Sequence, residues 1–167
     1  FLKPGASEKK AVIAITSNRG LAGGYNSNIS KLISYSGLKK EDVEIFAIGR
    51  KGRDTLKRRG YEIKADYSDV ITDPIYRDAA DFGHGLLHAF RYGEIGEIYL
   101  AYTSFKNTVS QEPVMMKLLP VEISAEESEK NAAPMNFEVD EETALDMIIP
   151  KYVQSLIYGG LLESVAS

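Results

Sequence analysis

Apolar and polar positions along the chain follow two periods, one typical of strands and one typical of helices. Continuous apolar runs at residues 11–16, 43–49 and 97–103 predict strands that are covered on both faces. The alternating residues 61–65 predict a more exposed strand, and residues 114–122 predict a further one. The sequence therefore predicts several short strands distributed over most of its length.

Apolar residues at helical spacing lie between these strands. They predict helices over residues 27–35 and 50–59, and a longer helix that begins at Asp73 and Pro74 and ends near Tyr92. Strands that alternate with helices of this length are typical of βαβ units. The pattern therefore predicts an α/β fold, with an open, mostly parallel sheet and flanking helices.

The final segment of the chain has a helical pattern of its own. Apolar residues recur at helical spacing over residues 141–167, so we expect a long helix that Pro150 kinks or splits. The apolar stripe persists to the last residues, which indicates that the helix continues beyond them. We therefore expect a globular domain over residues 1–140, followed by the truncated beginning of a long helix.

Composition narrows the class of protein without changing this picture. The 167 residues suit one domain, and 44% hydrophobic with 26% charged residues exclude a disordered or collagen-like chain. The net charge of −4 does not indicate nucleic-acid binding. The sequence has no cysteine, which excludes disulfides, zinc–thiolate sites, iron–sulfur clusters and a cysteine nucleophile. No apolar run approaches the roughly 18 residues of a membrane-spanning helix.

Charge is distributed unevenly along the chain. Residues 50–64 hold seven basic and two acidic residues, whereas residues 122–142 hold eight acidic residues and one lysine. We interpret the acidic segment as a surface loop with one short strand at 135–139. The two segments are either solvated surfaces or electrostatic docking faces that steer and orient partners.

A glycine-rich loop at residues 19–24 lies between a predicted strand and a predicted helix, where phosphates bind in many α/β folds. The loop matches neither G-x-G-x-x-G nor the P-loop pattern, because no lysine follows its glycines. At the end of the second strand, Gly49 and Arg50 stand where an acidic ribose partner is expected. We favour a tight turn with close packing over a nucleotide site.

No other constellation indicates catalysis. His84 and His88 have the i, i+4 spacing of metal ligands, but the H-E-x-x-H pattern and an evident third ligand are missing, so we favour partly exposed helix histidines. No serine lies in G-x-S-x-G, and acidic pairs such as Glu126 and Glu127 lie in a polar run. We therefore expect no catalytic residue, no cofactor and no metal.

Four blocks, in order along the chain, resemble a known family. Residues 15–28 read I-T-S-N-R-G-L-A-G-G-Y-N-S-N, residues 48–52 read I-G-R-K-G, and residues 102–113 read Y-T-S-F-K-N-T-V-S-Q-E-P. These blocks are similar to signatures of the gamma subunit of F-type ATP synthases, and residues 152–167 resemble the start of its long C-terminal helix. The residues that carry the signature are Arg19, Gly20, Gly23, Gly24, Asn26, Asn107, Gln111 and Pro113.

The resemblance implies a Rossmann-like domain at the foot of a rotor shaft. Family members carry long N- and C-terminal helices that form the shaft, and here both are absent or cut. Compared with the family pattern, this chain has Asn18 in place of the commoner Asp, and Ala22 in place of a common Cys. The regulatory cysteine insert of chloroplast subunits is missing, so the resemblance implies a bacterial-type subunit.

The resemblance also implies the function and the partners. Ion flow, of protons or sodium, turns a membrane ring, and the gamma subunit transmits this torque to the catalytic alpha/beta hexamer through its shaft helices. Gamma itself carries no catalytic residues and binds no nucleotide. Its implied partners are the epsilon subunit and the ring subunits, with no nucleic acid and no insertion into the membrane. Its implied location is peripheral, at the cytoplasmic face of the bacterial cell membrane.

Charge and position select two candidate subunit contacts, the basic helix at residues 50–59 and the stretch at residues 135–140 within the acidic segment. Two other functions remain as alternatives. One is a freestanding domain that binds a nucleotide or phosphate through Gly20 to Gly24, and the other is a metal-dependent hydrolase built on His84 and His88. The candidate interface residues are Arg50, Lys51, Arg53, Lys57, Arg58, Arg59, Phe137 and Glu138.

Overall fold

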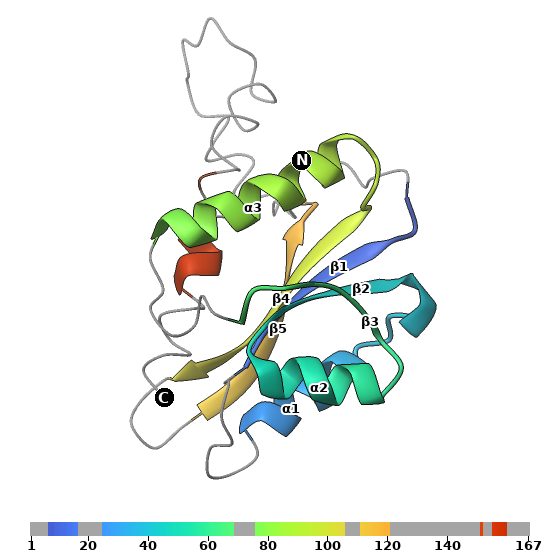
Figure 1. The fold of residues 1–167 in the computed structure, drawn as a ribbon, viewed down its shortest axis with the longest axis vertical. Helices are drawn as coiled ribbons and strands as arrows, with labels where there is room; N and C mark the ends of the chain where they lie inside the picture. Colours follow the sequence, from blue (N-terminus) through green and yellow to red (C-terminus); the bar gives the residue numbers. More distant parts are fainter. Residues whose placement is uncertain are drawn as a thin grey trace, which may run out of the picture.

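A computed structural model of the chain describes residues 7–16, 25–68, 76–105, 111–120, 151 and 155–159. Its elements follow one another as strands and helices, with one short 3₁₀ helix, and Figure 1 shows their arrangement. In chain order they are β1 (Lys10–Ile15), α1 (Tyr25–Ser34), η1 (Lys40–Asp42), β2 (Val43–Ile48), α2 (Arg50–Arg58), β3 (Glu62–Asp66), α3 (Tyr76–Arg91), β4 (Glu97–Phe105) and β5 (Gln111–Leu119).

The five strands form one sheet in the order β3-β2-β1-β4-β5. β1 pairs in parallel with β2 on one side and with β4 on the other, and Lys10 lies opposite both Val43 and Glu97. β3 continues the parallel pairing, while β5 runs antiparallel to β4 at the opposite edge. The predicted open, mostly parallel α/β sheet is confirmed.

Two apolar layers hold the helices onto the sheet. Val12 of β1 belongs to a buried cluster with Ile29 of α1 and Leu56 of α2, whereas Ile13 belongs to a second cluster with Leu87 of α3. Successive side chains of a strand point to opposite faces, so one strand contributes to both clusters. Accordingly α1 and α2 lie together on one side of the sheet and α3 lies on the other (Figure 1).

The described element boundaries largely confirm the prediction, with one shift, while the helix start predicted at Asp73 and Pro74 lies outside the described residues. The strand predicted at 114–122 runs from Gln111 to Leu119, three residues earlier. Its first residues are polar, and the apolar pattern missed them. Antiparallel pairing places Gln111 opposite Phe105, and a proline such as Pro113 is tolerated in an edge strand. The chain leaves the strand at Pro120, which follows a cis peptide bond.

The C-terminal helix is described only in part. Lys151 and residues 155–159 are helical, and Ile157 is fully buried in the cluster under α3. The predicted strand at 135–139, the acidic loop, the kink at Pro150 and the boundary after residue 140 lie outside the described residues. In the described segments, no helix combines the length and the apolar character needed to span a membrane.

Candidate interaction surface

The candidate surface is built on α2, and α2 is held by a hydroxyl from another element. The helix begins after Gly49, which has no side chain to cap it. Instead the Thr16 hydroxyl oxygen accepts a hydrogen bond of 2.8 Å from the Gly52 N–H and donates one of 3.3 Å to the Gly49 carbonyl. Thr16 follows β1 directly, and its own N–H donates to Ile48 O at 2.8 Å. The end of β1 thus supplies the cap that α2 lacks.

This contact requires glycine at two positions. Gly49 has a φ of +117°, and a Cβ there would lie 2.2 Å from the Thr16 carbonyl oxygen. A Cβ on Gly52 would lie 2.5 Å from the Thr16 Cγ2. Both distances are far below van der Waals contact, so any larger residue would push α2 away from the strand. The two glycines of the I-G-R-K-G block therefore permit the close approach of α2 to β1.

A second network ties α2 to the end of β3. The Gly49 N–H donates to the Ser68 hydroxyl oxygen at 3.1 Å, and the Ser68 N–H donates to Asp66 Oδ1 at 2.9 Å. The Ser68 hydroxyl also donates to the Asp66 carboxylate. On the other oxygen of that carboxylate, Arg53 Nη1 of α2 donates at 2.5 Å. The carboxyl ends of β1, β2 and β3 are therefore all linked to the first turn of α2.

The pKa of Asp66 reflects this network. Burial raises the pKa of the Asp66 carboxyl, but the hydrogen bonds from Ser68 and Arg53 outweigh that effect and hold it below its ordinary value. The hydrogen bonds of Arg53 to Asp66 and then to Asp54 raise the guanidinium pKa. Asp66 is therefore a carboxylate at neutral pH, and its charge supports the ion pair.

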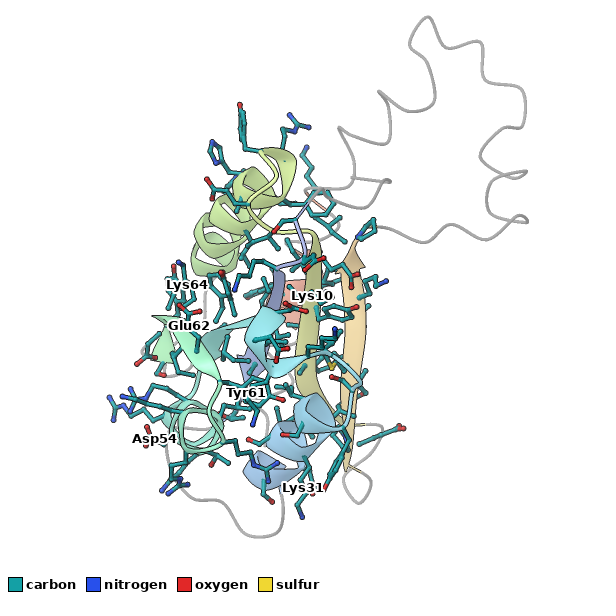
Figure 2. The ribbon with its side chains drawn as sticks, turned by 90° about the vertical axis from the view of Figure 1, so that its right-hand side faces the viewer. Lys10, Lys31, Asp54, Tyr61, Glu62 and Lys64 are labelled. Carbon is teal, nitrogen blue, oxygen red and sulfur yellow. The ribbon has the colours of Figure 1, made fainter. Side chains whose placement is uncertain are left out.

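The six cations predicted for docking separate into two groups. Arg53 binds Asp66, and Arg59 Nη1 donates to Ser34 Oγ of α1 at 2.9 Å, so both hold the fold together. The other four lie on the exposed face of α2, each three or four residues from Asp54 along the helix. Figure 2 shows the side chains around Asp54 projecting away from the sheet. The exposed cations are Arg50, Lys51, Lys57 and Arg58.

The helical layer around α2 is positively charged, although the whole chain is negative. Residues 25–42 and 50–61 contain nine lysines and arginines and three acidic residues, against a net charge of −4 for the chain. α1 and α2 pack against each other, so these charges share one side of the sheet. This layer can attract a negatively charged surface, and salt would weaken that attraction.

The remaining residues that the sequence analysis selected, for the family signature and for the second contact, do not lie on α2. Arg19, Gly20, Gly23, Gly24, Asn107, Phe137 and Glu138 lie outside the described residues. Asn26 lies in the first turn of α1, and Gln111 and Pro113 lie in β5, on the far edge of the sheet from β3. The structure therefore does not bring these three residues to the exposed face of α2.

The histidine pair has no metal-site geometry in the described part of α3. His84 and His88 are both exposed, as predicted, and the His88 ring stacks on Tyr92 with 4.4 Å between centroids. Across the described segments, no group of three His, Cys, Asp or Glu side chains could hold a metal ion. Nothing in the described geometry therefore supports the hydrolase alternative.

Sequence reasoning missed three residues that shape this surface, Thr16, Asp66 and Ser68. Their partners in the network lie up to 36 residues away along the chain, so no local pattern reveals the pairing. One signal was present. Two glycines at the start of a predicted helix, Gly49 and Gly52, indicate a close neighbour, and a threonine at the end of the adjacent strand is a candidate for it.

Comparison with known proteins identifies the family. A family model described as ATP synthase matches residues 1–167, the whole of this chain. The ATP synthase gamma chain of Lachnoclostridium phytofermentans is 56% identical to it over 175 residues. This chain belongs to the ATP synthase gamma family. The resemblance of the four sequence blocks is thereby confirmed.

Its gamma-family relatives are longer than this chain. The sodium ion specific gamma chain of Acetobacterium woodii is 35% identical over 187 residues. Both relatives cover all of this chain, yet the chain spans only 60% and 61% of their lengths. A solved chain from the central stalk and c-ring of Tetrahymena thermophila mitochondrial ATP synthase has a TM-score of 0.69 at 24% identity, over 96% of this chain and 71% of that chain. That solved chain therefore shares the fold described above.

We predict that Thr16→Val destabilises this gamma-family chain. Valine keeps the β-branched shape but leaves the buried Gly52 N–H without an acceptor, which costs about 1–3 kcal/mol of unfolding free energy. Urea unfolding measures the loss, and amide exchange at Gly52 should accelerate. Thr16→Ser keeps the hydroxyl and should lose much less. Equal stability of the valine variant and the unchanged chain would contradict the capping role.

We also predict a pH-dependent effect of Asp66→Asn. A carboxyl with a lowered folded-state pKa stabilises the fold above its unfolded pKa of about 3.9, and that contribution disappears as pH falls through the folded value. The variant should therefore be less stable than the unchanged chain at pH 7, with the gap closing below about pH 4. The Asp66 side chain is 36% exposed, so solvent keeps the gap small. Urea unfolding across this range tests it, and a pH-independent gap would refute it.

Proposed function

We propose that this chain is the globular part of the rotor, or central stalk, of a proton- or sodium-coupled F-type ATP synthase. The observation that carries the proposal is the match to ATP synthase gamma chains along the whole of this chain. The fold shared with a chain of the Tetrahymena central stalk supports it. In this role the subunit transmits torque between the membrane ring and the catalytic alpha/beta hexamer.

The proposed role is mechanical and non-catalytic. The polar side chains at the carboxyl ends of the strands, where α/β enzymes bind their ligands, are engaged in holding α2. We infer that α2 is held rigidly on the sheet by Thr16, Ser68 and Asp66, which suits a subunit that bears torque. We assign the chain no cofactor, no metal and no nucleic-acid partner, and place it peripherally at the cytoplasmic face of the bacterial cell membrane.

The proposed neighbours are the epsilon subunit, the ring subunits and, through shaft helices, the catalytic hexamer. We assign the exposed cations of α2 to a contact with an acidic surface of epsilon or the ring. Their clustering on one helical face supports this assignment, whereas Arg53 and Arg59 support the surface from within. Phe137 and Glu138 remain candidates for a second contact, because they lie in the acidic segment of residues 122–142.

Reconstitution tests the proposed function. A full-length gamma chain carrying this segment should restore ion-coupled ATP synthesis when added to complexes depleted of gamma. The 167-residue segment alone should not restore it, because torque reaches the hexamer only through the shaft helices. Measured ATP synthesis in sealed vesicles decides the result. Restoration by the segment alone, or failure of the full-length chain to assemble, would contradict the proposal.

Charge reversal tests the docking face. Lys51→Glu combined with Lys57→Glu should weaken binding of epsilon or the ring by about tenfold at low salt, since both lysines are exposed on α2. Titration at low and at high salt measures the affinity, and the loss should shrink at high salt. Arg91→Glu combined with Lys151→Glu changes the net charge equally at exposed positions outside the layer of α1 and α2, and serves as the control. Equal losses of affinity for the α2 pair and the control pair would contradict the assignment.

A further inference from the structure

A groove lies between α3 and the β2–β3 side of the sheet, on the face opposite α2. Its volume is about 310 Å³. Phe46 of β2 lies in it, Gly85 and Ala89 of α3 form one wall, and Lys64 of β3 belongs to the other side. Glu44 and Glu94 are also part of its lining. We refer to this feature as the α3 groove.

The groove exists because α3 covers only part of its face of the sheet. Leu86, Leu87 and Phe90 of α3 belong to a buried cluster with β1 and β4. β2 is an interior strand, yet its Phe46 is only half-buried on this face, whereas its Ile45 is fully buried under α1 and α2 on the other. A half-covered aromatic residue in an interior strand indicates a surface that a partner can complete.

Gly85 supplies the second observation. A glycine inside a helix destabilises it relative to alanine, and Gly85 lies within α3. Gly49 and Gly52 have a reason in the fold, because a Cβ on either would strike Thr16. A Cβ on Gly85 would meet nothing within 4 Å among the described residues. The described fold does not require this glycine, and its missing side chain keeps the wall of the groove open.

We propose that the α3 groove receives a large apolar side chain from an amphipathic segment of a neighbouring subunit. Gly85 and Ala89 are spaced i, i+4 and allow a partner backbone to approach closely, with Phe46 as the apolar contact. Glu44 and Glu94 outnumber Lys64, so the charge of the lining suits a lysine or arginine beside that apolar side chain. The inference rests on the proposed function, which supplies the neighbouring subunits.

Single-cysteine labelling tests the groove directly, because the 167 residues contain no cysteine. Gly85→Cys is introduced into the full-length gamma chain, freed of any cysteine elsewhere, and reacted with a maleimide before and after assembly into the synthase. Labelling should slow by about tenfold on assembly, because a seated side chain excludes solvent and reagent. His84→Cys, one residue away and outside the groove lining, is the control and should label at a similar rate in both states.

Two further substitutions separate blocking from misfolding. Gly85→Trp fills the groove and should weaken assembly by about tenfold, while His84→Trp adds the same bulk outside the groove and should not. Gly85→Ala should raise the melting temperature of the gamma chain by about 2–4 °C, since alanine favours the helix and meets no neighbour. A folded Gly85→Trp chain with unchanged assembly would overturn the proposal.

The labelling outcomes distinguish failure of the groove proposal from failure of the proposed function. Equal labelling of Cys at position 85 before and after assembly, in a chain that does assemble, overturns the groove and leaves the proposed function intact. Protection already present in the isolated full-length chain means that a segment of the same chain fills the groove, which also overturns the partner proposal. An unsubstituted full-length chain that never enters the complex overturns the proposed function, and the groove proposal with it.

Discussion

The burial of β1 between two helical layers is the constraint on which the rest of the structure depends. Residues 11–15 are at most 1% exposed, because the strand pairs on both edges and is covered on both faces. Among the described elements, the other four strands and the helices α1, α2 and α3 pack against this strand or against its direct neighbours in the sheet. Since β1 cannot move without opening both apolar layers, Thr16 at its end is a firm anchor point. The position of α2 follows from that anchor.

The anchoring of α2 decides which charges the protein presents. The cap from Thr16 and the ion pair with Asp66 set the rotation of the helix, so Arg53 and Arg59 face other elements of the fold. The remaining cations are then exposed as one group. A helix held at its first turn by the ends of three strands is firmly attached to the sheet, which suits the proposed place of this domain in a rotor. The anchoring of α2 thus accounts both for its firm attachment and for the set of charges that it exposes.

The helices cover the two faces of the sheet to different extents. α1 and α2 cover the face that carries the positive charge, and there Ile45 and Ala47 of β2 are fully buried. α3 leaves Phe46 half-covered on the opposite face. The proposed rotor role, in which the domain touches several subunits, calls for more than one contact surface. An electrostatic surface and an apolar groove on opposite faces meet that need.

The sequence by itself determined the α/β class, most element boundaries and the family, because these depend on local periodicity and on contiguous motifs. It also identified α2 as the basic helix. Its one shifted boundary, in β5, involves polar residues whose strand conformation comes from pairing with Phe105 and its neighbours. Only the tertiary structure decided which cations of α2 are exposed, why Gly49 and Gly52 are needed, and why Gly85 is not. These three features depend on contacts between residues far apart in the chain, such as Thr16 with Gly52. Local sequence patterns do not reveal such contacts, because only folding brings the two residues together.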